Sequence, residues 1–423
     1  MKVLVIGTGA REHALVTSLL ADPAVDAVIA APGNPGIATV ALCEPVDPLD
    51  PAAVSALARR HAVDLVVIGP EAPLVAGVAD AVRADGIACY GPSAEAARLE
   101  GSKAYAKDVM AAADVPTGMS RLCSTLEEVQ DALEVFGAPH VVKDDGLAAG
   151  KGVVVTGDRD AALAHARTCL AKDGGRVVVE EFLEGPEVSL FVVCDGTEVA
   201  PLTPAQDFKR VGEGDTGPNT GGMGAYSPLP WAPETLVEDL VARVARPVVA
   251  EMARRGTPFV GTLFIGLALT SRGPRVIEFN ARFGDPETQV VLARLRSPLG
   301  QLLYAAATGA LEGHPRLRWS EEAAVTVVVA AEGYPDTPRT GDRLDGLDAV
   351  EEVPTAYVLH GGTAIGADGT TVSSGGRVVS VVARGDDLAQ ARERAYAAVR
   401  RISLRGSHYR GDIALAASRG DLR

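Results

Sequence analysis

The first 92 residues alternate short apolar runs with amphipathic segments, and this alternation constrains the fold more than any other feature of the chain. Apolar strands that alternate with amphipathic helices form parallel sheets that are covered on both faces. We therefore predict an N-terminal parallel α/β domain in which ligands bind beyond the carboxyl ends of the strands. The expected strands are residues 3–7, 24–33 and 64–71, and the expected helices are residues 11–21, 51–62 and 73–86.

The remainder of the chain predicts further domains of a different kind. A length of 423 residues favours two to four domains. After about residue 93, helices and hairpins of a small α+β unit are expected, followed by a long glycine-rich loop without periodicity. A domain boundary is expected near residues 315–319, with strands and a helix after it. The expected loop is residues 212–230, the expected helices are residues 233–255 and 386–403, and two expected strands are residues 260–270 and 274–280.

Bulk properties exclude several classes of protein. The net charge is −15 and no long basic run is present, which argues against nucleic acid or an anionic membrane as the main partner. The five cysteines are scattered without a C-x-x-C pair, so a zinc site or a disulfide framework is not expected. No apolar run approaches the ~20 residues of a membrane span. We therefore expect a cytoplasmic protein whose partners are small molecules, and the sequence leaves the oligomeric state open, a monomer included.

Lysine is scarce in this chain, and its positions are informative. Only seven of the 40 basic residues are lysines, and two of them flank a loop of small residues in VVKDDGLAAGKGVVV at positions 141–155. An ammonium group is a compact point charge that proteins use on phosphates. We expect Lys103, Lys143, Lys151 and Lys209 to be retained for chemistry. For Lys103 and Lys107, four positions apart on an expected helix, two solvated lysines remain an equal alternative.

The loop between Lys143 and Lys151 is not a P-loop. A P-loop has four residues between its first glycine and the Gly-Lys pair, whereas here three residues separate Gly146 from Gly150. Gly152 also stands where a P-loop has a hydroxyl residue, and both flanks are strand-like. The pattern predicts a glycine-rich hairpin that covers a triphosphate with backbone donors and Lys151. A surface hairpin without a ligand is the alternative.

The stretch RVIEFNARFGDPETQ at 275–289 predicts a metal site. Glu278 and Asn280 are two positions apart on a strand, so both side chains leave on one face. A carboxylate beside an amide oxygen suits Mg²⁺, whose other ligands are water and phosphate oxygens. An exposed polar strand face is the alternative. Arg282 could clamp a carboxylate or phosphate, and Asp285 before Pro286 could either bind a ligand or only cap a helix.

Two further segments are more ambiguous. The turn GTGAREH suggests a dinucleotide fold, but Glu12 stands where the third glycine is required, so NAD binding is not favoured. The turn could still bind an anion at a helix N-terminus, or no ligand at all.

Glu180, Glu181 and Glu187 follow an apolar run. Such a strand exit could offer a backbone edge to a purine and a carboxylate to a ribose; solvated turn carboxylates are the alternative.

Taken together, these motifs resemble the glycinamide ribonucleotide synthetase (phosphoribosylamine–glycine ligase) family of ATP-grasp enzymes. The matching stretches run in order along nearly the whole chain. They include VLVIGTGAREHAL, LEGSKAYAKDVM, VVKDDGLAAGKGVVV, EEFLEGPEVSLF, QDFKRVGEGDTGPNTGGMGAYSPLP and VIEFNARFGDPETQ. The resemblance implies an N-terminal α/β substrate-binding domain, an ATP-grasp domain with a mobile hairpin subdomain, and a small C-terminal α+β, β-rich domain. The implied bounds are residues 1–101, 102–314 with the subdomain at about 115–190, and 320–423.

The resemblance also implies a reaction. ATP would phosphorylate the carboxylate of glycine, and the amine of 5-phosphoribosylamine would then attack the glycyl phosphate to give glycinamide ribonucleotide for purine biosynthesis. ATP and Mg²⁺, or Mn²⁺ in its place, would be required. The rival hypotheses are another ATP-grasp carboxylate–amine ligase, an ATP-dependent carboxylase, a nucleotide-sensing protein without turnover, and a nicotinamide oxidoreductase.

Roles for individual residues follow from the resemblance. The metal ligands would be Glu278 and Asn280, and the catalytic residues would be Lys151, Arg282 and Asp207. The nucleotide would contact Lys103, Lys143, Gly150, Lys151, Gly152, Glu180, Phe182, Glu187 and Phe264. The ribosyl phosphate would contact Gly9, Arg11, Asn34 and Glu71, and the acceptor site would contain Asp207, Lys209, Thr220, Gly221, Gly222 and Met223. Arg282 would hold the carboxylate of glycine, and Gly284 and Asp285 would also bind substrate.

This sequence departs from the family pattern at a few positions. Phe208 stands where many members have histidine, so an acid–base role for that position is in doubt and Asp207 and Lys209 become the favoured residues. Thr8 and Ala10 replace residues more frequent in the glycine turn, which weakens the predicted phosphate site there.

Overall fold

The N-terminal sheet is parallel, as the alternation predicts. The computed structural model describes residues 1–146 and 152–422, and its first five strands pair in the order β3-β2-β1-β4-β5. Alternate residues of β1 enter different cores: Leu4 packs with Leu57 of α2, and Val5 packs with Leu15 of α1. Both faces of the sheet are therefore covered. The elements are β1 (Lys2–Gly7), α1 (Ala10–Leu20), β2 (Ala27–Pro32), η1 (Ile37–Thr39), β3 (Leu42–Cys43), α2 (Pro51–Arg60), β4 (Leu65–Ile68) and β5 (Ala88–Tyr90).

The helix expected at residues 73–86 is interrupted. The structure has two short helices, α3 (Glu71–Val75) and α4 (Val78–Ala84), on either side of Gly77. Gly77 has φ of +85°, a left-handed conformation that ends a helix and that glycine adopts without steric penalty. The amphipathic pattern of residues 73–86 gives no indication of this break, and within that pattern only Gly77 marks its position.

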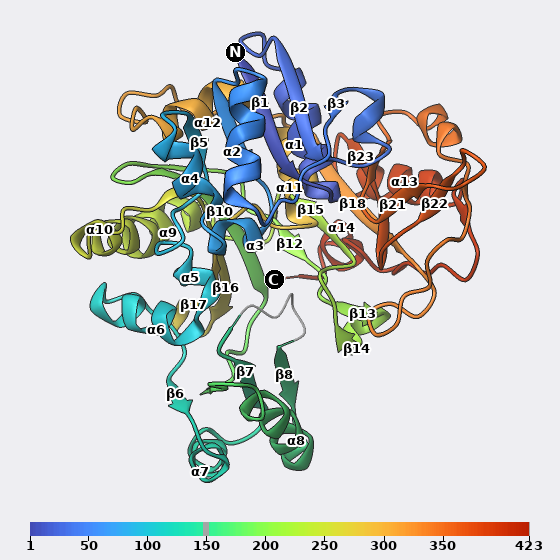
Figure 1. Cartoon of the computed structure of the whole chain (residues 1–423). Helices are drawn as coiled ribbons and strands as arrows, with labels where there is room; N and C mark the ends of the chain where they lie inside the picture. The colour runs from blue at the N-terminus through green and yellow to red at the C-terminus, as the bar shows by residue number, and fades with distance from the viewer. Residues whose placement is uncertain (147–151, 423) are drawn as a thin grey trace.

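A small lobe follows the N-terminal part. Helices α5 (Arg98–Gly101) and α6 (Lys103–Ala112) lead to an antiparallel sheet in the order β6-β9-β7-β8. In Figure 1 this lobe projects away from the rest of the molecule. The strands expected on both sides of the glycine loop are confirmed as β7 and β8. The lobe consists of β6 (Ser120–Cys123), α7 (Leu126–Phe136), β7 (His140–Asp144), β8 (Val153–Thr156), α8 (Arg159–Leu170) and β9 (Val177–Glu180).

A second sheet lies above this lobe in Figure 1, and its order is β11-β10-β16-β17. The two strands expected at 260–270 and 274–280 form its antiparallel pair β16 and β17. The expected helix at 233–255 is present but contains a π-helical turn before Pro247, a residue that has no N–H to donate. The elements are β10 (Glu187–Asp195), β11 (Val199–Pro201), α9 (Leu236–Leu240), η3 (Val241–Ala245), α10 (Arg246–Arg254), β16 (Val260–Thr270), β17 (Gly273–Asn280), α11 (Glu287–Arg294) and α12 (Leu299–Ala307).

The third sheet corrects the prediction of a featureless loop at 212–230. Its order is β12-β15-β18-β23-β20, and β15 (Gly224–Ser227) lies inside the predicted loop. All four residues of β15 are buried between β12 (Gln206–Asp207) and β18 (Ala323–Ala330). Such a short strand has no periodicity of its own, because its partners rather than its propensity make it a strand.

The remaining elements complete this sheet and the C-terminal part. They are β13 (Arg210–Gly212), η2 (Glu213–Asp215), β14 (Thr216–Asn219), β19 (Leu344–Asp345), η4 (Asp348–Glu352), β20 (Tyr357–His360), β21 (Thr363–Ile365), β22 (Thr371–Ser373), β23 (Arg377–Gly385), α13 (Leu388–Val399), β24 (Ser403–Leu404) and α14 (Leu415–Arg419). Within the described part of the chain, no helix is long and apolar enough to cross a membrane.

The buried His13 and the half-buried His360 join the N-terminal and C-terminal parts. The backbone N–H of His360 donates to Nδ1 of His13 at 2.9 Å, and the two ring centroids are 5.9 Å apart. Burial lowers the pKa of His13 to about 3 and that of His360 to about 4. Both rings are therefore neutral in the folded protein, and this junction requires them to remain so.

We predict that acid weakens this junction. A histidine with a lowered folded-state pKa contributes stability above the unfolded pKa of about 6.5, and that stability is lost as the pH falls toward the folded value. At pH 5.5 the loss for His13 is roughly 1.4 kcal/mol. His13→Asn retains an acceptor for the His360 N–H, so its melting temperature should fall less between pH 7.5 and 5.5 than that of the wild type. His314→Asn, at a half-buried histidine outside this junction, serves as control and should match the wild type; equal acid sensitivity of all three proteins would contradict the prediction.

Candidate active site

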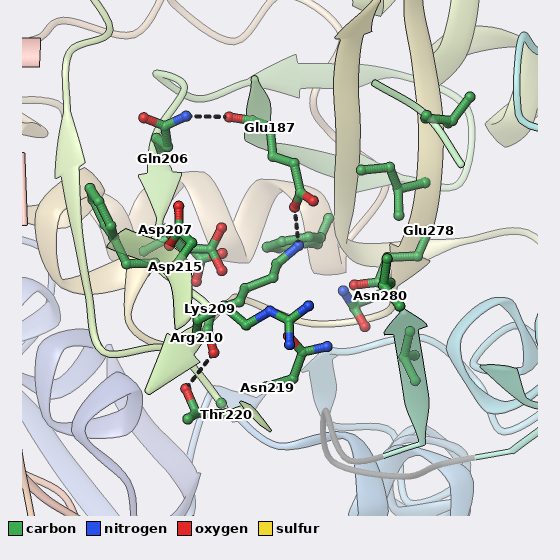
Figure 2. Close-up of a pocket in the computed structure, with 18 of the residues that line it drawn as sticks. Glu187, Gln206, Asp207, Lys209, Arg210, Asp215, Asn219, Thr220, Glu278 and Asn280 are labelled. Carbon is green, nitrogen blue, oxygen red and sulfur yellow. Dashed lines mark hydrogen bonds and ion pairs between the residues drawn. The ribbon is translucent and has the colours of Figure 1, made fainter. Parts of the chain in front are cut away.

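A cavity of about 960 Å³ lies where the N-terminal part, the small lobe and the second sheet, β11-β10-β16-β17, meet. Glu71 lines it from the first part, Lys143 and Glu180 from the second, and Glu278 and Asn280 from β17. Figure 2 shows the charged side chains of β10, β12, β13 and β17 directed into one space. Most of the residues for which the sequence predicts a role thus surround this cavity.

Glu278 and Asn280 lie side by side at the end of β17, as their spacing predicts (Figure 2). Burial alone would raise the pKa of Glu278, but Lys209, Lys143 and Lys103 outweigh it and lower that pKa. The carboxylate therefore remains ionised beside an amide oxygen. This arrangement fits a hard divalent cation better than it fits an exposed polar strand face.

The scarce lysines gather at one wall of this cavity. Lys143 Nζ lies 2.9 Å from Glu180 Oε2 and donates to the carbonyl of Ile277 at 3.1 Å, where a bulge interrupts the pairing of β17. Lys107 Nζ lies 3.3 Å from the other oxygen of Glu180. Lys103 donates to the carbonyl of Gly146 at 3.0 Å. Burial lowers the pKa of both Lys103 and Lys107.

The acidic strand exit is more highly paired than the sequence suggests. Glu180 is 3% exposed and is held by two ammonium groups, and Glu187 pairs with Lys209 at 2.5 Å. Glu181 accepts from the Met119 N–H at 3.2 Å. The alternative of solvated turn carboxylates therefore does not hold for Glu180. A role for Glu180 or Glu187 in nucleotide binding stays a prediction.

The glycine-rich hairpin is only partly described. Gly150 and Lys151, predicted to contact the nucleotide, lie outside the described residues. Gly152 at the start of the second flank lines the cavity, as predicted. Asp144 points away from Lys143 and pairs with Lys172, which agrees with strand alternation.

Asp207 and Lys209 face the cavity together, as residues two apart on an extended segment do (Figure 2). Burial raises the pKa of Asp207 to about 7, and the nearby carboxylates of Glu287, Glu187 and Glu278 add to the effect while Lys209 opposes it. Burial would lower the pKa of Lys209, but the attraction of Glu187 and Asp207 raises it instead. One ammonium group thus lies among several carboxylates.

Some residues of the predicted acceptor loop, Thr220 to Met223, line the cavity, and others are buried in the core. Thr220 donates from its N–H and its hydroxyl to the carbonyl of Lys209, at 2.7 and 2.8 Å, and both Thr220 and Gly221 line the cavity. Met223 is fully buried in the core, and Gly222 packs against Pro286. The Met223 side chain turns inward and its N–H donates to the Phe208 carbonyl at 2.8 Å, so a contact of this residue with a substrate stays a prediction.

Arg282 is held between two carboxylates. Its guanidinium lies 3.3 Å from Glu71 and 3.0 Å from Glu100, and the N–H of Ala281 donates to Glu100 at 2.7 Å. Arg282 has five N–H donors, so capacity for a ligand remains. The attraction of Arg282 and Arg11 outweighs burial and lowers the pKa of Glu71. Glu71 therefore orients Arg282 in this structure, whereas the sequence associates it with a phosphate.

Asp285 is not a helix cap. Helix α11 begins after Pro286 without a side-chain cap, and the carboxylate of Asp285 lies 3.3 Å from Arg377 and accepts from Gln289 at 2.7 Å. Arg377 also donates to the carbonyls of Gly221 and Asp285, both at 2.7 Å. Arg377 thereby connects the acceptor loop to the segment that follows β17.

The glycine turn of the N-terminal domain lines a second cavity of about 450 Å³. Here the N–H of Gly9 donates to Glu12 Oε2 at 2.6 Å, so the carboxylate of Glu12 occupies the helix terminus. Asn34 uses its amide on the carbonyls of Thr8 and His360, at 2.8 and 2.9 Å. Gly9 and Asn34 line this second cavity, whereas Arg11 lines the first. The structure thus divides the predicted phosphate residues between two cavities.

The aromatic residues occupy different ends of the main cavity. Phe182 is 43% exposed near the exit of β9. Phe264 is buried, pairs with Asn280 across the strands and packs on Phe191 at a ring distance of 5.4 Å. It lies four residues along β16 from Ala268, the partner of Glu187. Phe264 therefore lies near the acid–amide pair, and its predicted role as a wall for adenine stays a prediction.

Three family profiles match consecutive parts of the chain. They are the N domain of phosphoribosylglycinamide synthetase over residues 1–100, its ATP-grasp (A) domain over residues 101–288, and its C domain over residues 324–416.

This chain belongs to the phosphoribosylglycinamide synthetase family.

The chain is also similar over its full length to several members of this family. The phosphoribosylamine–glycine ligase of Streptomyces coelicolor is 66% identical over 420 residues, which are 99% of this chain and 100% of the relative. That of Mycobacterium tuberculosis is 58% identical over 427 residues and the match covers all of both chains. The crystal structure of phosphoribosylamine–glycine ligase from Thermotoga maritima has a TM-score of 0.83 at 29% identity and covers 98% of this chain and 100% of that chain. The predicted α/β, ATP-grasp and C-terminal fold class is confirmed.

Members of the ATP-grasp superfamily use ATP and a divalent metal ion. A biotin carboxylase domain from Hydrogenobacter thermophilus, solved with MgADP, has a TM-score of 0.70 at 17% identity, a likeness that concerns the fold alone. Among the described residues of this synthetase-family chain, no group of three or more His, Cys, Asp or Glu side chains could hold a metal by itself. A pair of oxygen donors fits an ion that takes its remaining ligands from water and phosphate.

Some residues of this synthetase-family site have no role assigned by the sequence. Lys107, Glu100, Glu287 and Arg377 all line the cavity or contact a residue that does. Glu287 lies inside the GDPETQ stretch, and Lys107 lies one helical turn after Lys103. The sequence pattern could therefore have indicated a role in the site for both residues. The pairing of Arg377 with Asp285 joins residues 92 positions apart, which no local pattern indicates.

We predict that Asp207→Asn stabilises the ligand-free protein at alkaline pH. An aspartate whose pKa rises from 3.8 to about 7 on folding costs stability as the pH rises from about 4 to 7, and the cost is constant above that. The melting temperature of the variant should exceed that of the wild type by on the order of 2 °C at pH 8. The difference should vanish near pH 4, and a variant that is less stable at pH 8 would contradict the prediction.

Proposed function

We propose that this chain is an ATP-dependent carbon–nitrogen ligase that joins glycine to 5-phosphoribosylamine through a glycyl phosphate intermediate. The products would be glycinamide ribonucleotide, ADP and phosphate. The observation that carries the proposal is the cavity in which the acid–amide pair Glu278 and Asn280 lies within the field of Lys103, Lys143 and Lys209. The full-length relatives named phosphoribosylamine–glycine ligase support the same reaction.

The cavity addresses the central difficulty of the reaction, which is that a carboxylate and a triphosphate must approach each other. Lys103 and Lys143 place positive charge beside Glu278, where desolvation strengthens every electrostatic interaction. A Mg²⁺ ion held by Glu278 and Asn280, or Mn²⁺ in its place, would neutralise phosphate oxygens at the same position. The glycine-rich segment after β7 would exclude water from the acyl phosphate.

The two half-reactions use neighbouring residues. In the first, Arg282 holds the carboxylate of glycine, which attacks the terminal phosphorus of ATP so that ADP leaves. In the second, the amine of phosphoribosylamine forms the C–N bond, phosphate leaves with the electrons of the acyl C–O bond, and Asp207 accepts the proton that the nitrogen loses. A carboxyl group with a pKa of about 7 suits this role at neutral pH. The loop at Thr220 and Gly221 bounds the acceptor side.

We retain one rival from the same superfamily, a carboxylate–amine ligase with another acceptor, because only the substrate loops QDFK at 206–209 and GPNTGGMGAYSPLP at 217–230 separate the two. One assay distinguishes the candidates. Purified protein with ATP, Mg²⁺, glycine and freshly prepared phosphoribosylamine should release ADP and phosphate in equal amounts and form the amide. Turnover with a different amine would favour the rival, and absence of ADP release with every amine tested would favour a nucleotide sensor.

We predict that Glu278→Gln shifts the metal requirement of the reaction. The substitution retains the shape and one oxygen donor but removes the negative charge, so the Mg²⁺ concentration for half-maximal activity should rise by roughly 10–100-fold. Saturating Mg²⁺ should restore part of the activity, which a folding defect would not allow. The matched control is Glu251→Gln on α10, which removes a buried carboxylate away from the cavity. An unchanged Mg²⁺ titration for Glu278→Gln would contradict the assignment of the ligand.

A further inference from the structure

Glu287 is an exception among the buried glutamates. The structure buries four glutamates almost completely within residues 1–146 and 152–422, and three of them pair with a cation. Glu12 lies 2.6 Å from Arg11, Glu180 lies 2.9 Å from Lys143, and Glu251 lies 2.7 Å from Arg254. Glu287 is 3% exposed and forms no ion pair within 4.0 Å among the described residues, although Lys209 and Arg282 attract it from farther away. An isolated buried carboxylate is costly unless a cation is supplied.

The carboxylate of Glu287 is held in place and faces the main cavity. One oxygen accepts a hydrogen bond from the hydroxyl of Ser189 at 3.0 Å, and Glu287 lines the cavity. The other oxygen lies beside Gly284, where an added Cβ would be 2.6 Å from Oε2 and 2.8 Å from the ring of Phe264. Glycine at position 284 therefore leaves this carboxylate uncovered. The neutral partner Ser189 orients the charge without cancelling it.

We infer that Glu287 binds the α-ammonium group of the amino acid substrate, an inference that rests on the proposed function. Glycine is a zwitterion whose carboxylate we place at Arg282, five residues before Glu287 on the same turn into α11. Its ammonium group would supply a cation in direct contact, whereas Lys209 and Arg282 attract Glu287 only from beyond ion-pair distance. Burial raises the pKa of Glu287 in the absence of a ligand, as expected for a carboxylate without a cation.

This contact has two chemical consequences. An ammonium group is selected over a hydroxyl or a methyl group at the same position, because only the cation compensates the buried charge. A protonated amine also lacks the lone pair needed for attack. Glycine held in this way does not condense with a second activated glycine, and the glycyl phosphate is reserved for the amine of the acceptor.

The test is Glu287→Gln in the full chain, with glycine and glycolate compared. Gln retains the shape and an oxygen for Ser189 but removes the charge. A hydrogen bond between charged groups is worth ~1.5–3 kcal/mol, so the KM for glycine should rise at least tenfold. The Ki of glycolate as a competitor of glycine should stay within about twofold, as should the KM values of ATP and phosphoribosylamine. Glu287→Asp, which retains the charge, should keep the preference for glycine over glycolate even if both bind more weakly.

The outcomes separate this inference from the proposed function. A wild-type protein that shows no turnover with glycine and phosphoribosylamine overturns the proposed function and the inference together. A wild-type protein that turns over, with Glu287→Gln retaining the preference for glycine over glycolate, overturns the inference alone. Should Glu287→Gln fail to fold, Ser189→Ala replaces it, with an expected smaller rise in the KM for glycine and an unchanged Ki for glycolate. Glu251→Gln should leave both constants unchanged, because its carboxylate is buried away from the cavity.

Discussion

The buried ion pair of Lys143 and Glu180, together with the hydrogen bond from Lys143 to β17, positions the groups on which the site depends. Both side chains are 3% exposed, and the ammonium group also reaches the carbonyl at the bulge of β17. The ion pair links β7 to β9 within the small lobe, and the hydrogen bond from Lys143 to the carbonyl of Ile277 attaches this lobe to β17 of the second sheet. Removal of one member of such a pair leaves an uncompensated charge at a cost of about 3–5 kcal/mol. The same pair fixes the position of a cation next to Glu278, which lies beyond that bulge.

In the absence of ligands, the carboxylates of Asp207 and Glu287 in the cavity lower the stability of the protein. The raised pKa values of Asp207 and Glu287 show that their ionised forms are unfavourable in the free protein, and Glu287 forms no ion pair within 4.0 Å among the described residues. Groups of this kind reduce the stability of the free protein and become favourable when substrates and metal ions supply the missing charges. The arrangement is preorganised for ligands that carry a carboxylate, an ammonium group and phosphates. Selectivity then arises because a ligand that lacks one of these charges leaves a buried group uncompensated.

The sequence predicts those features that depend on short-range pattern. The parallel N-terminal sheet follows from alternation, and the shared face of Glu278 and Asn280 follows from the period of two. Strand β15 is missed because its neighbours in the sheet come from distant parts of the chain. The burial of the Met223 side chain and the pairing of Glu71 with Arg282 are not predicted for the same reason: side-chain direction in a loop is decided by packing and ion pairs that sequence spacing does not encode. Resemblance to a family supplies reaction and cofactor, but not these contacts.

The order of strands in the third sheet has a consequence for how the polypeptide could be divided. Strand β15 lies between β12 on one side and β18 on the other, so residues of the ATP-grasp segment and of the C-terminal segment share one hydrogen-bonded surface. A cut between residues 288 and 324 would expose the backbone of β15 as an unpaired edge that is apolar on its inner side, a surface prone to aggregation. The two profile-defined domains are thus separate in sequence but inseparable as folding units, and a gene split at this junction would produce fragments that need each other to fold.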